Sequence, residues 1–205
     1  MMPGRPERVQ MSHPAAPRVQ LFALLVCLLA GGCATTQPSN INDLCSILAE
    51  QPEWRAAAAQ AESRWGTRPA IALAFIRHES SFKSAAKPPR RKLLGILPWL
   101  RPSSAFGYAQ ATDAAWDDYQ RASGRRFVRR TDFADSVDFV GWYNSVSHRV
   151  LGLDLADSYS LYLAYHEGHQ GFRAGSWRRN DALKRYAAQV AARARQYASD
   201  LRRCP

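Results

Sequence analysis

Apolar side chains recur along most of the chain with the period of an α-helix, and strand-like alternation is nearly absent. The pattern therefore predicts a mainly α-helical domain. Capping residues, prolines and glycines mark the ends of the periodic segments, with Thr67, Thr112, Thr131 or Asp132, and Asn180 as expected N-caps. The expected helices are residues 42–50, 52–65, 68–81, 113–123, 133–147, 158–167 and 181–201.

One of these helices carries a carboxylic acid on its apolar face. Ala72, Phe75, Ile76 and Glu79 stand at positions i, i+3, i+4 and i+7. Because burial disfavours a charged carboxylate, we expect the pKa of Glu79 to be raised. An acid that stays protonated near neutral pH can serve a glycosidase as general acid. A buried glutamate paired with an arginine, or one at the rim of the core, would be structural, and the stripe alone leaves both interpretations open.

A basic, proline-containing segment interrupts the helical pattern at residues 83–102. Its prolines exclude a continuous helix, and an apolar run at residues 93–100 lies among its lysines and arginines. We expect a basic insertion with a hydrophobic tip. It would either pack on the domain or act as a lid or membrane contact. A second basic run, residues 125–130, is expected to be a linker.

The first 33 residues have the features of an export signal. Arginines precede an apolar run at residues 21–30, which is too short to span a bilayer. The series Leu29-Ala30-Gly31-Gly32-Cys33 resembles a lipoprotein signal. The resemblance implies removal of residues 1–32 and lipidation of Cys33. Ordinary secretion with Cys33 as a plain thiol is the alternative, and translation could start at Met1 or Met11.

A lipidated Cys33 would anchor the protein by acyl chains, without a transmembrane helix. Residues 33–41 then form a lipidated tether, and residues 42–205 form the catalytic domain with its basic insertion. Ala34, where sorting rules would place an aspartate for retention, implies by the same resemblance the outer membrane. We therefore expect a periplasmic, lipid-anchored protein.

Two cysteines remain near the ends of the folded part once Cys27 leaves with the signal and Cys33 takes lipid. In an oxidising compartment, Cys45 and Cys204 are expected to form a disulfide that joins the N-terminal helix to the C-terminal one. Two separate buried thiols are the alternative.

The charge of the chain favours an anionic partner. The 205 residues carry a formal net charge of +11, which becomes +9 when residues 1–32 take away three arginines and one glutamate. An exported protein rarely meets nucleic acid, so we expect no nucleic-acid partner and favour acidic lipid or a cell-wall polymer. A basic surface that serves solubility alone is the alternative.

Three short motifs follow one another along the chain: Glu79-Ser80 at a helix end, Gly107-Tyr108-Ala109-Gln110 at a turn, and Ala164-Tyr165-His166-Glu167-Gly168 at another helix end. Their order resembles the lytic transglycosylases of the lysozyme superfamily, which carry Glu-Ser, Gly-Leu-Met-Gln and Ala-Tyr-Asn-x-Gly. The resemblance spans Trp65 to about Trp177. Here Tyr-Ala replaces Leu-Met, and His166 stands in the place of asparagine.

The resemblance implies a lysozyme-like SLT domain that cleaves the MurNAc–GlcNAc β-1,4 bond of peptidoglycan as a lyase, without a cofactor. Glu79 alone would act as general acid and base, because the muramyl 6-hydroxyl attacks the anomeric carbon and leaves a 1,6-anhydro end. The protein would be a monomer that binds glycan strands, and envelope proteins are further candidate partners. Substrate-binding roles would fall to Ser80, Gly107, Tyr108, Gln110, Tyr165, His166 and Glu167, with the two tyrosines stacking on sugars.

Three alternatives are kept beside this interpretation. If Glu167 faced Glu79, it would supply the second carboxylate of a hydrolytic lysozyme, although we favour a structural role such as orienting His166. A non-catalytic peptidoglycan-binding lipoprotein is the second alternative. A zinc site is the third, but Gln170 stands where His-Glu-x-x-His requires histidine, so we expect no metal. No Gly-x-Ser-x-Gly elbow supports a serine hydrolase.

Overall fold

The structure is a computed structural model that describes residues 37–88, 92–93, 97–98 and 103–204. The expected signal at 1–32, the lipidation site Cys33 and the start of the tether lie outside the described residues. So do parts of the basic insertion, at 89–91, 94–96 and 99–102. None of the described helices has the length and hydrophobicity of a membrane span.

Helices dominate the described residues, which confirms the predicted mainly α-helical class. Within the insertion, two short strands pair antiparallel, with Lys92 opposite Pro98 and Leu93 opposite Leu97. In chain order the elements are α2 (Leu44–Glu50), α3 (Glu53–Trp65), α4 (Pro69–Ser80), β1 (Lys92–Leu93), β2 (Leu97–Pro98), α5 (Asp113–Ser123), α6 (Phe133–Leu151), α7 (Ser158–Ala174), the 3-10 helix η1 (Ser176–Arg179) and α8 (Asp181–Leu201).

Side-chain caps explain why several helices begin where the sequence predicts. Thr112 accepts a hydrogen bond from the backbone N–H of Ala115, and Asp132 and Asn180 cap α6 and α8 in the same way. Thr67 does not cap α4, because its buried hydroxyl instead donates to the carbonyl of Gly141. The N-cap of α4 is Arg68, which makes no side-chain capping bond.

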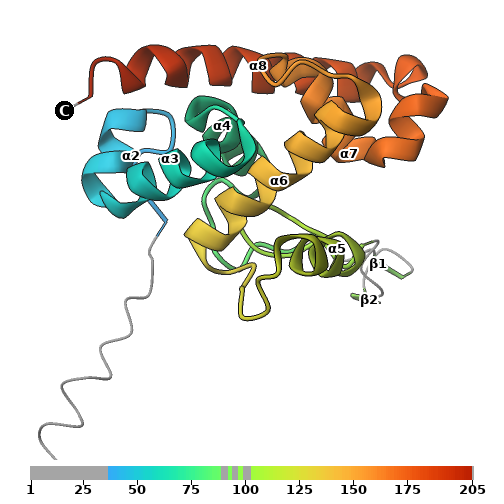
Figure 1. Ribbon diagram of the computed structural model, residues 1–205, viewed down its shortest axis with the longest axis horizontal. Coiled ribbons are helices and arrows are strands. Elements are labelled where there is room, and N and C mark those ends of the chain that lie inside the picture. The colour runs from blue at the N-terminus through green and yellow to red at the C-terminus, as the bar shows by residue number, and fades with distance from the viewer. Residues whose placement is uncertain (1–36, 89–91, 94–96, 99–102, 205) are drawn as a thin grey trace, which may run out of the picture. The chain divides into compact units, whose positions relative to one another are not determined.

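Helix α4 lies at the centre of the domain. Residues 70–76 are all buried, because α3, α6 and α8 pack around the helix. Helix α8 runs along both α4 and α7, and α3 packs on α6 (Figure 1). A helix that is apolar all round is a core helix. The C-terminal end of α4, which carries Glu79, is therefore held by neighbours on several sides.

The domain begins before residue 42. Gln37 donates to the carbonyl of Ser81, Ser39 donates to the carboxylate of Glu50, and the carbonyl of Ile41 accepts from both Arg77 and Tyr197. Residues 37–41, the second half of the expected tether, are thus bound to the folded domain.

Cys45 and Cys204 form a disulfide. The bond joins α2 to the residues that follow α8, across a sequence separation of 159 residues. It closes almost the whole described domain into one loop.

Candidate active site

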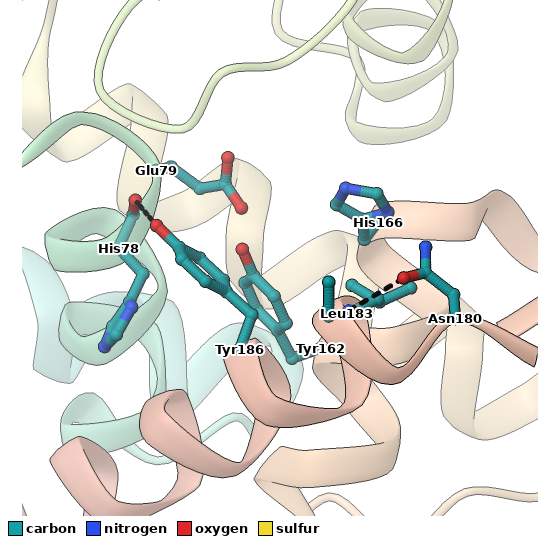
Figure 2. Close-up of a pocket in the computed structure, with 8 residues that line it drawn as sticks. His78, Glu79, Tyr162, His166, Asn180, Leu183 and Tyr186 are labelled. Carbon is teal, nitrogen blue, oxygen red and sulfur yellow. Dashed lines mark hydrogen bonds between the residues drawn. The ribbon is translucent and has the colours of Figure 1, made fainter. Parts of the chain in front are cut away.

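Glu79 lies in the last turn of α4 and lines a cavity of about 430 Å3. The helix ends abruptly because Ser81 and Phe82 adopt positive φ angles of 53° and 61°. The ring of Phe82 then enters the core beside Trp54, with ring centroids 5.4 Å apart. The cavity, called here the acid pocket, is lined by His78, Glu79, Tyr162, His166, Asn180, Ala182, Leu183 and Tyr186 (Figure 2).

Burial raises the pKa of Glu79 from an ordinary value of 4.5 to about 7. The hydroxyl of Tyr162 donates a hydrogen bond to the carboxylate, which favours the charged form and partly offsets burial. In Figure 2 the Tyr162 hydroxyl points at the carboxylate from below. Glu79 keeps partial exposure because the pocket that it lines is open to solvent. The side chain is therefore poised to exchange a proton near neutral pH.

Tyr165 joins the third motif to the second. Its hydroxyl donates to the backbone carbonyl of Ala109 at 2.6 Å, and its ring packs edge-on against Phe75. Burial raises its pKa well above the ordinary value, with the charges of Glu79 and Tyr143 adding to the effect. The ring thus lies between the acid pocket and the Gly107–Gln110 turn.

The turn that carries Gln110 depends on one glycine. Gly107 has a φ of 82°, and a Cβ placed there would lie 2.0 Å from the carbonyl oxygen of Arg130. The same Arg130 oxygen accepts from the N–H of Tyr108, so residues 125–130 hold the turn rather than acting only as a linker. Gln110 itself has a φ of 49° and donates its Nε2 to the carbonyls of Ala86 and Gly107. A bond from Gln110 to a substrate would therefore come through Oε1.

Two expected substrate contacts are wrong. Tyr108 is 0% exposed, and its ring packs edge-on against both Trp54 and Phe133, so no sugar can stack on it. Ser80 is 5% exposed, and its hydroxyl donates to the carbonyl of Ile76. Tyr108 belongs to the core because the turn at Gly107 directs its side chain inward. The hydroxyl of Ser80 bonds within the last turn of α4.

His166 and Glu79 face each other across the acid pocket (Figure 2). Glu167 is not among the residues that line it. Glu167 accepts a hydrogen bond from the Ser176 hydroxyl and lies 3.3 Å from Nδ1 of His166. The structure thus places Glu167 where it can orient His166. His169 lies farther along α7 and bonds to Ser147, and the described residues hold no cluster of three metal-ligating side chains.

Several residues of the pocket were not predicted from the sequence. Tyr162 precedes Tyr165 by three residues, so the two share a face of α7, and this spacing could have indicated it. Tyr186 from α8 donates to the backbone carbonyl of His78, at 3.4 Å. The His78 ring points away from Glu79 in Figure 2, and burial lowers its pKa to about 4, helped by the charges of Arg77 and Arg193.

The acid pocket is one of several adjoining hollows. His166 also lines a pocket of about 200 Å3 with Gln110, Tyr165 and Glu167. That pocket shares Tyr143 and Gly168 with a larger groove of about 780 Å3 beside α5 and α6. The three pockets adjoin one another in an extended binding region, which suits a polymeric ligand better than a small molecule.

Comparison with protein families gives a match to the chain. No curated protein and no solved structure matches the chain. A family model described as the transglycosylase SLT domain matches residues 21–204, a segment that includes all three motifs. This match confirms the resemblance that the motifs indicate. The chain therefore belongs to the transglycosylase SLT domain family.

Proposed function

We propose that the protein is a lytic transglycosylase that cleaves the MurNAc–GlcNAc β-1,4 bond of peptidoglycan and forms 1,6-anhydro-MurNAc ends. Membership of the SLT family supports a transglycosylase-type action on peptidoglycan. The observation that carries the finer proposal is Glu79, a single carboxylic acid with a pKa of about 7 inside a pocket.

Glu79 acts twice in this reaction. Because the pKa is about 7, the protonated and the charged form of Glu79 are both populated near neutral pH. The protonated acid gives its proton to the glycosidic oxygen as the bond from that oxygen to C1 of MurNAc breaks. The 6-hydroxyl of the same sugar then bonds to C1, and the carboxylate of Glu79 takes the hydroxyl proton. No water is consumed, and Glu79 ends the cycle protonated.

The position of Glu167 supports a one-carboxylate reaction over hydrolysis. A hydrolytic glycosidase needs a second carboxylate on the other side of the scissile bond. Glu167 instead contacts Ser176 and His166, and it lines the neighbouring hollows rather than the acid pocket. In our proposal His166 and the Oε1 of Gln110 bind the sugar, and Tyr165 packs beneath it.

The cellular location belongs to the same proposal. The sequence supports a periplasmic protein that is lipidated at Cys33 and held at the outer membrane. Mass spectrometry of the N-terminal peptide from native membranes would check it. A diacylglyceryl-modified Cys33 is expected, and a mature chain that begins elsewhere with a free thiol would contradict it.

Digestion of purified sacculi by residues 33–205 tests the activity. We expect muropeptides with 1,6-anhydro ends, identified by mass. Glu79→Gln should lower the rate by about 10²–10⁴-fold or more, since that is the usual contribution of a general acid. Glu62→Gln is a matched control, because Glu62 is exposed on α3 and lies outside the pocket.

Three outcomes would overturn the proposal. Reducing ends would indicate a hydrolytic lysozyme. Binding to sacculi without release of muropeptides would indicate a non-catalytic binding protein. Full activity of Glu79→Gln would remove Glu79 from the reaction.

A further inference from the structure

A second concave site adjoins the acid pocket on the other side of His78 and Tyr186. It has a volume of about 480 Å3 and lies between α4 and α8. Arg77 comes from α4 and Arg193 from α8, while Gln189 and Gln196 complete its polar lining. We call it the arginine pocket. His78 and Tyr186 line both cavities and form the wall between them.

The two guanidinium groups of the arginine pocket are close neighbours. Both donate to the same atom, Oδ1 of Asn42, at 3.0 Å from Arg77 and 3.4 Å from Arg193. Two positive charges that share one acceptor atom repel each other, and an anion bound between the two guanidinium groups would relieve this repulsion. Both arginines also act on His78 in the shared wall, so their field reaches the border of the acid pocket.

The other hydrogen-bond acceptors of the two arginines are neutral oxygen atoms, and the Arg193 guanidinium also lies over the Tyr197 ring, 5.7 Å from its centroid. Arg77 donates to the Ile41 carbonyl and the Ser81 hydroxyl, and Arg193 donates to the Asn42 carbonyl and to Oε1 of Gln196. Within the described part of the chain neither arginine forms an ion pair. A guanidinium has five N–H donors, so each keeps donors for a further acceptor.

The carboxylates in this region are engaged elsewhere. Asp43 and Asp200 act electrostatically on Tyr197, as the two arginines do. Asp43 caps α2 by accepting from Cys45 and Ser46, and Asp200 pairs with Arg203. The positive charge of the arginine pocket therefore meets no carboxylate of its own domain among the described residues.

We propose that the arginine pocket binds a carboxylate carried by the glycan substituent next to the cleaved bond. The inference rests on the proposed function, because it takes a muramyl sugar to occupy the acid pocket. The peptidoglycan sugars themselves are neutral, and their carboxylates lie on the substituent at C3 of MurNAc. This is a lactyl carboxylate in a denuded strand and the carboxylates of the stem peptide in a complete one. Paired guanidinium groups suit such an anion.

Binding of uncleavable fragments tests the pocket directly. The probes are the stem tripeptide L-Ala–γ-D-Glu–meso-diaminopimelate, free N-acetylmuramic acid, and neutral N-acetylglucosamine, each titrated into residues 33–205 by calorimetry. We expect binding of the tripeptide or the muramic acid, weakened about tenfold or more in Arg193→Gln, since charge-assisted hydrogen bonds are lost. Arg195→Gln is the matched control, because Arg195 is exposed on α8 outside the pocket.

Each outcome has one meaning. An effect of Arg193→Gln on the tripeptide identifies the stem peptide as the source of the carboxylate, and an effect on muramic acid alone identifies the lactyl group. If neither acidic probe binds, or if Arg193→Gln and Arg195→Gln bind both as the wild type does, the proposal is overturned. None of the probes contains a glycosidic bond to cleave, so this result is independent of whether the protein cuts sacculi.

A second variant covers the case in which Arg193→Gln does not fold, since Arg193 also holds Asn42. Gln189→Glu adds a carboxylate to the exposed lining of the pocket and removes no hydrogen bond of either arginine. Ala188→Glu adds the same charge on α8 outside it. We expect only Gln189→Glu to weaken binding of the acidic probe. Equal affinity in the two variants would refute the proposal that the arginine pocket binds the carboxylate.

Discussion

Burial raises the pKa of Glu79, and the raised pKa has a consequence for stability. Charging a group buried in this way disfavours the folded state. The folded-state pKa of about 7 lies above the ordinary 4.5, so the neutral side chain contributes stability that is complete below pH 4.5. That contribution is lost as the pH rises through about 7. The proposed catalytic acid thus makes the protein less stable in alkali.

Glu79→Gln should therefore stabilise the protein at high pH. The two pKa values differ by an amount that corresponds to up to about 3 kcal/mol, and partial exposure reduces it. We expect a gain of about 1–3 kcal/mol in the free energy of unfolding at pH 9, relative to the effect at pH 4. Urea unfolding at both pH values measures it, with exposed Glu62→Gln as control. The same effect at both pH values would contradict the raised pKa.

Tyr162 sets how far the pKa of Glu79 rises. Its hydrogen bond lowers the pKa of Glu79, so Tyr162→Phe should raise that pKa further. The alkaline limb of kcat/KM against pH, expected near pH 7 in the wild type, would then move to higher pH. Tyr159→Phe on the same helix lies outside the pocket and should leave the limb in place. A limb that moves to lower pH in Tyr162→Phe would show that the hydrogen bond acts in the opposite direction.

At the residue scale, the sequence predicts what periodicity controls. The stripe Ala72, Phe75, Ile76 and Glu79 correctly places the carboxylate against the core, and the raised pKa follows from burial. Tyr108 could not be placed in the same way, because its direction depends on the positive φ of Gly107 and on the close approach of Arg130. Such turn geometry leaves no periodic signal.

Helix α7 owes its bend to Gly168. There φ is 72° and ψ is 160°, a conformation that is essentially restricted to glycine. The bend lies directly after His166 and Glu167, so it sets the course of the second part of α7, which leads to Ser176, the hydrogen-bond partner of Glu167. The sequence predicts that α7 ends at this glycine. The chain instead resumes its helix to Ala174, because Gly168 interrupts the φ/ψ pattern at a single residue.

Gly168→Ala should cost about 1–3 kcal/mol of stability through backbone strain and also lower kcat/KM. A Cβ at Gly168 meets nothing within 4 Å, so the effect would come from the backbone and not from a clash. Gly124→Ala is the matched control: Gly124 has a φ of 71°, an equally open Cβ position and a place at the end of α5. It should lower Tm without changing kcat/KM. If both variants lose activity equally, the bend has no special part in the site.

The sequence predicts a helix boundary correctly where a local side chain or glycine caps the helix. The limits of α5 and α8 match the prediction, since Thr112, Gly124 and Asn180 act locally. Helix α6 runs on to Leu151 instead of Ser147, because the hydroxyl of Ser147 bonds within the helix to the carbonyl of Tyr143 and the C-cap is Gly152. A serine can either end a helix or lie inside one, so the position of Ser147 within α6 could not be predicted from its residue type.

For the whole molecule, the disulfide closes the longest loop in the described chain. Constraining 159 residues in the unfolded state corresponds to about 5 kcal/mol on the chain-entropy model. Reduction, or the double change Cys45→Ser and Cys204→Ser, should therefore lower stability by about 2–5 kcal/mol. Thermal melts with and without dithiothreitol measure it. The double variant should not respond to the reductant, and a wild-type Tm unaffected by reduction would contradict the prediction.

For the whole molecule, the sequence predicts the disulfide better than it predicts where the folded domain starts. An oxidising compartment and one cysteine near each end suffice to suggest the pairing of Cys45 with Cys204. The sequence predicts that the domain starts at residue 42, whereas Gln37 already bonds to Ser81, and Ile41 to Arg77 and Tyr197, all far away in the sequence. The sequence does not predict the arginine pocket for the same reason, since its residues come from α4 and α8, which are far apart in the chain.

The covalent link between the two ends of the domain also determines how a mechanical load would spread. A pull applied at residue 37 first stretches the hydrogen bonds that hold residues 37–41, and then reaches Cys45. There the disulfide passes part of the tension to the residues after α8, and α8 packs on α4, the helix that carries Glu79. Force from the N-terminal side is thereby shared between two ends of the fold, and α2 need not peel away first.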